Sequence, residues 1–199
     1  MKSLKPILFL LITVTNVHSF ASEKDKSFQE QSMLSVLYVQ TSTEFAANNI
    51  QTFNNASKAL DIALQDNTWT AALEQKGNFA SKIPAIIVDV DETVLDNSSF
   101  QSRTILSGLS YPNGWAKWVN ESKATAVEGV YEFLHYANDN NVKIFYVTNR
   151  LETFREPTIK NIKKLGLPFD DNANTLLMRV DENVRDKTER RKNIAENYR

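Results

Sequence analysis

The sequence predicts an α/β fold: a doubly wound parallel sheet with an insertion of about thirty residues and an N-terminal helical layer. Three observations lead to this prediction. Apolar runs alternate with helical patterns, polar residues follow each run, and about thirty extra residues come after the first run. An order of strand, helix, strand and helix is typical of a parallel sheet covered on both faces. A length of 199 residues suits one compact domain of this kind.

The apolar runs are the predicted strands. They lie at residues 83–90, 142–147 and 175–180. Continuous apolar runs are typical of strands that are buried on both faces of a parallel sheet. Apolar residues at helical spacing over 32–64 predict the N-terminal helical layer, which we assign to residues 22–82.

Local signals mark the helices between the predicted strands. Residues 125–128 and 186–189 have the pattern of a capping box, in which two side chains satisfy free backbone N–H groups at a helix start. Pro157 suits the first turn of a helix, and Gly166 suits a helix end. The sequence therefore predicts helices that begin near residues 125, 157 and 186.

The first 21 residues have the composition of a secretory signal peptide. Lys2 and Lys5 precede an apolar run that is too short to span a bilayer, and small residues occupy positions 19 and 21. We expect cleavage after Ala21 and a periplasmic or secreted bacterial protein without a stable membrane anchor. The absence of cysteine excludes disulfides and a lipid-modified N-terminal cysteine. A net charge of −1 gives no electrostatic basis for binding a nucleic acid polymer.

In doubly wound sheets the functional site lies at the carboxyl ends of the strands. The first predicted strand runs into Asp89 and Asp91, the second runs into Thr148 and Asn149, and the third leads to Lys187. Side chains on a strand alternate between faces, so the two aspartates share one site only if the strand ends between them. We expect all three strand ends to meet at one edge of the sheet.

Several kinds of carboxylate site do not fit the pair of aspartates. An EF-hand loop that starts at Asp89 would need glycine and glutamate where Val94 and Phe100 stand. A glycosidase needs its two carboxylates on opposite sides of a sugar. An aspartate that caps a turn explains one carboxylate well and two poorly. If the chemistry is phosphoryl transfer, the lack of cysteine and the single histidine after residue 21 leave a carboxylate as the nucleophile.

Four segments extend this pattern: "IIVDVDETVL", "WAKWV", "FYVTNR" and "KTERRKNIAENY". Together they resemble the class C acid phosphatases, which are exported bacterial phosphomonoesterases of the haloacid dehalogenase (HAD) superfamily. The resemblance implies a HAD-like core at residues 83–199 with a cap at about residues 97–126. It also implies a hydrolase that acts on small phosphate monoesters, such as nucleoside monophosphates or aryl phosphates.

The resemblance also implies a role for each residue at the strand ends. Asp89 would attack phosphorus and form an aspartyl-phosphate, and Asp91 would protonate the leaving alcohol and then activate water. Thr148, Asn149 and Lys187 would hold the phosphate. Mg²⁺ would sit on the Asp89 carboxylate and the Asp91 backbone carbonyl. Because Asp91 must start protonated, we expect an acidic pH optimum.

Aromatic residues in the cap region have two interpretations. Phe100, Tyr111 and Trp115 would stack on a nucleobase or aryl group of the substrate, or they would pack the cap against the body. For Trp118 we expect packing. The apolar faces of the N-terminal helices fit either a cover over the sheet or a homodimer contact.

The sequence departs from the family at one place. The second pair of aspartates of the family, expected on a strand after the helix that contains Lys187, does not occur within the 199 residues. Asp170 and Asp171 precede the third strand and lie at the opposite side of the sheet. Two hypotheses follow: an inactive fragment of a secreted phosphatase that lacks its C-terminal strand, or a naturally short, non-catalytic protein that binds phosphate or another ligand. We favour the first, because Asp89, Asp91 and Lys187 are all retained.

Overall fold

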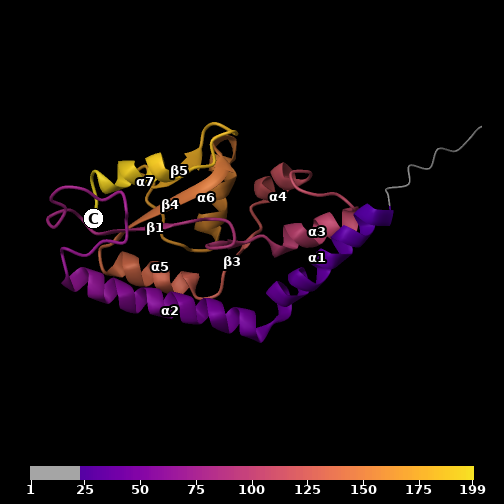
Figure 1. Cartoon of the computed structure of the whole chain (residues 1–199), viewed down its shortest axis with the longest axis horizontal. Coiled ribbons are helices and arrows are strands. Elements are labelled where there is room, and N and C mark those ends of the chain that lie inside the picture. Colours follow the sequence, from indigo (N-terminus) through magenta and orange to yellow (C-terminus); the bar gives the residue numbers. More distant parts are fainter. Residues whose placement is uncertain (1–22) are drawn as a thin grey trace, which may run out of the picture.

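The computed structural model describes residues 23–199, with side chains from residue 31 onward. The signal peptide expected at residues 1–21 lies outside the described residues. Figure 1 shows a small α/β body, two long N-terminal helices that run along it, and a pair of helices beyond the ends of the strands. None of the helices in residues 23–199 has the length and apolar character needed to cross a membrane.

The body contains a parallel sheet with the strand order β1-β4-β5. Its strands are β1 (Ala85–Val88), β4 (Lys143–Leu151) and β5 (Leu176–Arg179). β1 is shorter than predicted, because the chain turns sharply after Val90. β4 is longer than predicted and continues through the polar residues 148–150, since Leu151 still pairs with Arg179 after an irregularity in register. The prediction of a parallel sheet is confirmed.

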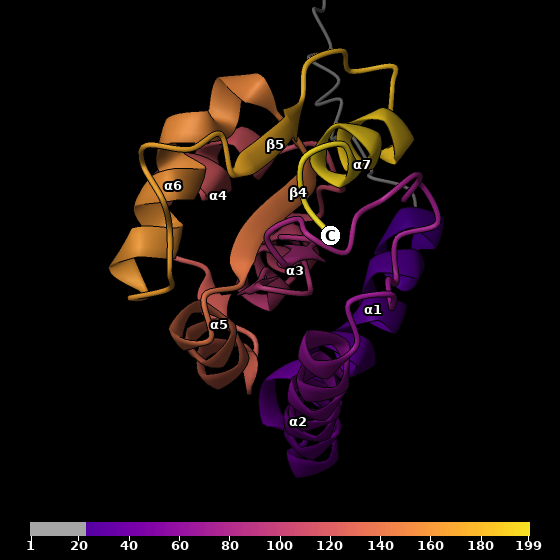
Figure 2. The same ribbon diagram turned by 90° about the vertical axis from the view of Figure 1, so that its left-hand side faces the viewer.

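Helices cover both faces of this sheet. The helices of the body are α5 (Val130–Asp139), a 3-10 turn η1 (Glu152–Phe154), α6 (Arg155–Lys164) and α7 (Thr188–Ala195). Figure 2 shows β4 and β5 between α6 on one side and α7 on the other. The buried side chains form one cluster on each face, which confirms the doubly wound arrangement.

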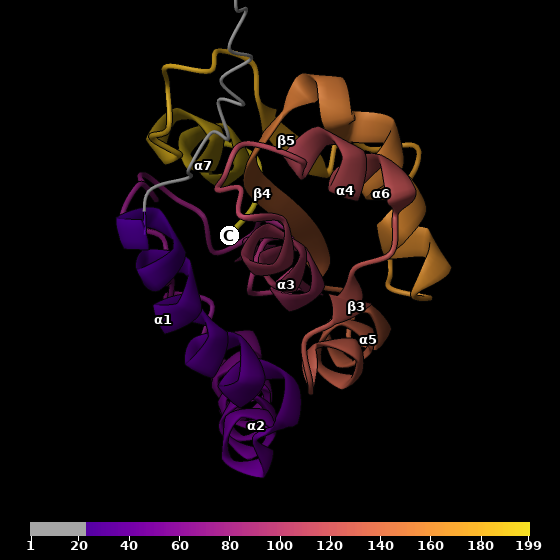
Figure 3. The same ribbon diagram turned by 90° about the vertical axis from the view of Figure 1, so that its right-hand side faces the viewer.

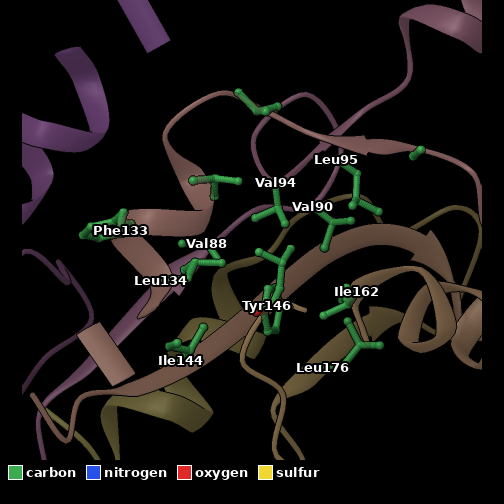
Figure 4. Packing of buried hydrophobic residues seen from close by; sticks show 14 of the residues in the cluster. Val88, Val90, Val94, Leu95, Phe133, Leu134, Ile144, Tyr146, Ile162 and Leu176 are labelled. Atoms are coloured by element: carbon green, nitrogen blue, oxygen red, sulfur yellow. The ribbon is translucent and has the colours of Figure 1, made fainter. Parts of the chain in front are cut away.

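The larger cluster lies between the sheet and the helices α5 and α6. Tyr146, Leu134, Ile162 and Leu176 are fully buried in it. Figure 4 shows them with Val88, Val90, Val94, Leu95, Phe133 and Ile144. On the other face, Phe145 and Val147 pack against Ile194 of α7. Alternate residues of β4 therefore supply the two clusters, as expected for a central strand.

Two helices form the N-terminal layer, α1 (Glu23–Thr41) and α2 (Thr43–Gln65). They are separated at Ser42, whose hydroxyl accepts a hydrogen bond from the N–H of Phe45 at 3.2 Å. α2 packs on α5 so closely that a Cβ at Gly129 would lie 3.0 Å from the backbone of Ile50. The helical layer is confirmed, and it covers the body and the side of the cap.

Both predicted capping boxes are wrong. Thr125 lies in a short strand, and α5 begins only at Val130, after Gly129 with a φ of +83°. α7 begins at Thr188, and the Asp186 carboxylate accepts hydrogen bonds from the N–H (2.8 Å) and hydroxyl (2.7 Å) of Thr188. Residues 125–128 begin with a strand pair instead of a helix start. Residues 186–189 begin with a turn that Asp186 closes, and the helix follows that turn.

The inserted residues form a unit on a narrow base. β2 (Leu95–Asp96) pairs antiparallel with β3 (Thr125–Ala126). Between them lie α3 (Ser98–Ser107) and α4 (Trp115–Glu121), which are joined by a two-pronged ion pair from Arg103 to Glu121. Figure 3 shows these two helices in front of the strands, with α1 beside α3. Gln40 of α1 donates a hydrogen bond to the Ser98 hydroxyl at 3.1 Å.

Residues 198 and 199 lie beside the open edge of β1. Tyr198 forms a parallel bridge with Ile83, and the N–H of Ala85 donates to the carbonyl of Arg199 at 2.7 Å. This is the position at which the resemblance places a further strand. A cavity of about 620 Å³ continues along the same edge, lined by residues of α2, β1, α7 and the loop before β1.

Candidate active site

The polar residues predicted at the strand ends meet at the carboxyl edge of the sheet. Asp89 directly follows β1, Thr148 and Asn149 lie in β4, and Lys187 precedes α7. The Lys187 ammonium nitrogen lies 2.7 Å from an oxygen of the Asp89 carboxylate. This ion pair joins the end of the first strand to the segment after the third.

Asp89 is the accessible carboxylate of the site. Its side chain is 43% exposed, whereas that of Lys187 is 21% exposed. One carboxylate oxygen accepts a hydrogen bond from the N–H of Val90 at 2.7 Å. The N–H groups of Val94 and Leu95 both donate to the carbonyl of Val90, which closes the turn after the strand. The turn and the lysine fix a carboxylate that is open to solvent, as an attacking nucleophile requires.

Asp91 is held in a buried network. Arg150, only 2% exposed, donates to its Oδ1 at 2.8 and 3.0 Å and to its Oδ2 at 3.3 Å. The amide of Asn97 donates to Oδ1 at 2.9 Å, and the indole N–H of Trp118 donates to the Asn97 oxygen at 2.8 Å. Three contacts therefore converge on Oδ1, while Oδ2 keeps a single long one. Oδ2 is therefore the oxygen that has room for a further contact.

This network connects the cap to the sheet. Trp118 lies in α4 and is 3% exposed, which confirms that it packs in the interior. Arg150 lies in β4, and its second amino group donates to the hydroxyl of Thr158 in α6 at 3.1 Å. A movement of the cap therefore acts directly on the orientation of the Asp91 carboxylate.

Thr148 and Asn149 are positioned from the opposite face of the sheet by Arg190 of α7. Arg190 donates to the Thr148 carbonyl, and to the side-chain oxygen of Asn149 at 2.7 Å. Thr148 is fully buried, and its hydroxyl accepts from the N–H of Arg150 at 3.0 Å. Burial, and then the charge of Arg179, lower the pKa of Arg190 from its ordinary value.

The predicted aromatic residues come together at the mouth of the site. Trp115 makes edge contacts with Phe100 (5.1 Å between ring centroids) and Tyr111 (5.9 Å). The Arg150 guanidinium lies 5.4 Å from the Trp115 ring centroid, a cation–π arrangement. Phe100 is buried and Tyr111 is exposed.

All three aromatic residues line a cavity of about 330 Å³. Its remaining lining comes from the loop after β1, from α3, from β4 and from the end of β5: Asp91, Glu92, Asn97, Gln101, Thr104, Asn149, Arg150, Arg179 and Arg185. A ring-shaped group in this cavity would touch the aromatic wall and lie next to Asp91.

Comparison with known proteins agrees with this geometry. Residues 12–199 match the family described as HAD superfamily, subfamily IIIB (Acid phosphatase). The chain belongs to this family.

Two solved structures of this family's fold are similar to the chain. One is the class C acid phosphatase from Bacillus anthracis with tungstate bound, and the other is the structure of the same phosphatase, with TM-scores of 0.76 and 0.75. Each is 32% identical to the chain, and each match covers 86% of the chain and 66% of the solved protein. The predicted resemblance to class C acid phosphatases and the HAD-like fold are confirmed.

HAD phosphatases generally use a divalent metal, but the described side chains do not complete a metal site. No group of three or more His, Cys, Asp or Glu residues that would hold an ion occurs among the residues described. The Asp91 carboxylate is occupied by Arg150 and Asn97, which leaves Asp89 as the accessible carboxylate donor.

Three arginines of the site were missed in the sequence. No role was predicted for Arg150, which ends the segment "FYVTNR", and neither Arg179 nor Arg190 was predicted to lie at the site. Two of them could have been predicted from the sequence. Arg150 and Arg179 come at the ends of apolar strand segments, so they lie near the carboxyl edge of the sheet. Arg190 could not, because its role depends on where α7 begins.

Proposed function

We propose that the protein is an exported acid phosphatase that hydrolyses small phosphate monoesters through an aspartyl-phosphate on Asp89. The observation that carries this proposal is the pairing of an accessible Asp89 with Lys187, next to an Asp91 that is fixed by Arg150. The relative with tungstate bound supports it as well, because tungstate is a tetrahedral oxyanion like phosphate.

The first half of the reaction uses the two aspartates in turn. A carboxylate oxygen of Asp89 attacks phosphorus, and the bond from phosphorus to the leaving oxygen breaks. Oδ2 of Asp91 gives its proton to that oxygen, so the product leaves as a neutral alcohol. Lys187 offsets the negative charge on the phosphoryl group, and the amide of Asn149 contacts its oxygens. Thr148 is fully buried and supports this strand end from within, so it does not take the predicted contact with phosphate.

The second half restores the enzyme. Asp91, now ionised, takes a proton from water, and the water oxygen attacks phosphorus. The bond between phosphorus and Asp89 breaks, and inorganic phosphate leaves. Because Arg150 and Asn97 hold Oδ1 in both halves, Oδ2 stays in place to accept the proton that it gave away.

We propose Mg²⁺ as the cofactor, on the Asp89 carboxylate and the Asp91 backbone carbonyl. One carboxylate, together with water and substrate phosphate, is a common way to bind this ion. The donors in the described residues are an incomplete set, so the proposal rests on the family.

Substrates with a ring in the leaving group fit the site best. Phe100, Tyr111 and Trp115 form one wall of the cavity beside Asp91, which favours nucleoside monophosphates and aryl phosphates over aliphatic esters. The class C family is exported, which supports a periplasmic or secreted location. The alternative of a non-catalytic binding protein has less support, because Asp89, Asp91 and Lys187 are all retained.

The test is hydrolysis of 5′-AMP and of p-nitrophenyl phosphate by the full-length protein with Mg²⁺. Asp89→Asn should lower kcat by at least about a thousandfold, because it removes the nucleophile. Asp139→Asn, an exposed change at the end of α5, is the matched control and should leave kcat unchanged. Equal activity of Asp89→Asn and the wild type would overturn the proposal. Binding of phosphate without hydrolysis by the wild type would favour the non-catalytic alternative.

A further inference from the structure

Arg179 is a buried cation without a carboxylate partner in the described part of the chain. It is the last residue of β5 and is 7% exposed. One of its amino groups donates to the carbonyl of Glu182 at 2.9 Å, while its buried Nε has no hydrogen-bond partner. Buried charges are normally paired, and an unpartnered buried donor is costly. Such a group at the edge of a cavity points to a ligand.

The other cations of the site have partners. Lys187 pairs with Asp89, Arg150 pairs with Asp91, and Arg190 is used to hold β4. Arg179 and Arg185 make no ion pair within 4.0 Å among residues 31–199. Arg190 makes no ion pair among these residues either, but its donors go to the Thr148 carbonyl and the Asn149 side chain, so Arg179 and Arg185 are the cations of the site left for a ligand.

Both arginines line the cavity of about 330 Å³ that also contains the aromatic wall and Asp91. Residues 180–184 connect them, so they line the cavity from the end of β5 and from the loop that follows it. A leaving group held against the aromatic wall therefore lies in the same cavity as two cations that pair with no carboxylate of residues 31–199.

We infer that Arg179 and Arg185 bind a second anionic group on the substrate, so that the preferred substrate is an aromatic phosphate monoester with a further negative charge, such as a nucleoside bisphosphate. This inference rests on the proposed phosphatase function. Arginine binds phosphate through two parallel N–H donors, and Arg179 lines the cavity with only one of its amino groups engaged, on the Glu182 carbonyl. The Asp89 end of the site then receives the phosphate that is cleaved, and the arginines receive the one that is retained.

The experiment compares kcat/KM for adenosine 3′,5′-bisphosphate and for 5′-AMP at constant ionic strength, using the full-length protein. The wild type should prefer the bisphosphate by about tenfold, the usual value of one hydrogen bond between charged groups. Arg179→Gln and Arg185→Gln should each move this ratio toward one. Lys164→Gln, an exposed change on α6, should leave it unchanged. If Arg179→Gln does not fold, Arg185→Gln decides, because Arg185 is exposed.

Several outcomes would overturn the inference. One is an equal kcat/KM for both substrates in the wild type, as expected if a carboxylate elsewhere in the full-length protein neutralises Arg179. Another is that Arg179→Gln or Arg185→Gln weakens inhibition by inorganic phosphate but leaves the ratio of the two kcat/KM values unchanged. The arginines would then bind free phosphate and not the substrate.

Failure of the proposed function has a different signature. If the wild type hydrolyses neither nucleotide, binding of both to Asp89→Asn is followed by tryptophan fluorescence. If Asp89→Asn binds the bisphosphate more tightly than 5′-AMP, and the additional change Arg185→Gln removes this difference, the two arginines bind the second anionic group even without catalysis. Equal binding of the two nucleotides overturns the inference.

Discussion

Replacing Asp91 should destabilise the protein more than replacing Arg150, although the two side chains form one ion pair. Arg150 is 2% exposed and Asp91 is 25% exposed. Asp91→Ala leaves the guanidinium inside the protein with only neutral partners, which costs about 3–5 kcal/mol. Arg150→Met leaves a carboxylate that water reaches and that Asn97 still contacts at 2.9 Å. After allowance for that exposure, we expect a loss of about 1–2 kcal/mol.

Urea unfolding at neutral pH measures both losses, with the slope m compared among variants. The double variant Asp91→Ala/Arg150→Met should be more stable than Asp91→Ala alone, because it leaves no unpaired charge. Asp139→Ala serves as the exposed control. Two results would contradict this reasoning: Arg150→Met is as destabilising as Asp91→Ala, or the two losses simply add. Either would mean that the unpaired guanidinium is not the cause of the loss of stability in Asp91→Ala.

Three further variants test other parts of the site. Glu92 is exposed as a residue, but partial desolvation of its carboxyl raises the pKa above its ordinary value of 4.5. The carboxyl therefore favours the folded state below that pH, and this contribution is lost as the pH rises. Glu92→Gln should leave the free energy of unfolding unchanged at about pH 4 and raise it at neutral pH, and a gain at both pH values would contradict this. Trp118→Phe removes the hydrogen bond to Asn97, and should cost about 1–2 kcal/mol in urea unfolding and lower kcat; unchanged stability would mean that the bond is not formed. Arg190→Met frees the Asn149 side chain and should raise KM for 5′-AMP about tenfold with a smaller change in kcat. An effect on kcat alone would mean that Arg190 does not act by positioning Asn149 for substrate binding.

The sheet and the location of the site were predictable because apolar strands end where polar residues begin. Asp89, Asn149 and Lys187 follow such ends, and a parallel sheet brings those ends to one edge. Pro157 and Gly166 marked the two ends of α6 as predicted, whereas the two capping-box patterns did not mark helix starts. Thr125 has the residue type of a helix cap, but its backbone pairs with Asp96 in the base of the cap, and no pattern within four residues reveals that contact.

The charge pairs of the site also depended on the fold. Sequence reasoning treated Asp89 and Asp91 as two carboxylates that affect each other. In the structure each has its own cation, Lys187 for the first and Arg150 for the second. Which cation meets which carboxylate is decided by the turn after β1 and by the length of β4, and neither is written in the short motif itself.

Detection of phosphate covalently bound to Asp89 is the most direct test of the central claim. The full-length protein is mixed with ³²P-labelled 5′-AMP and quenched in acid, and the labelled peptide is identified by mass spectrometry. The label should be on Asp89 and absent in Asp89→Asn. It should accumulate in Asp91→Asn if an activated substrate with a good leaving group is used, because the water step lacks its base. Turnover by the wild type with no label on Asp89, or with the label on another residue, would contradict the account.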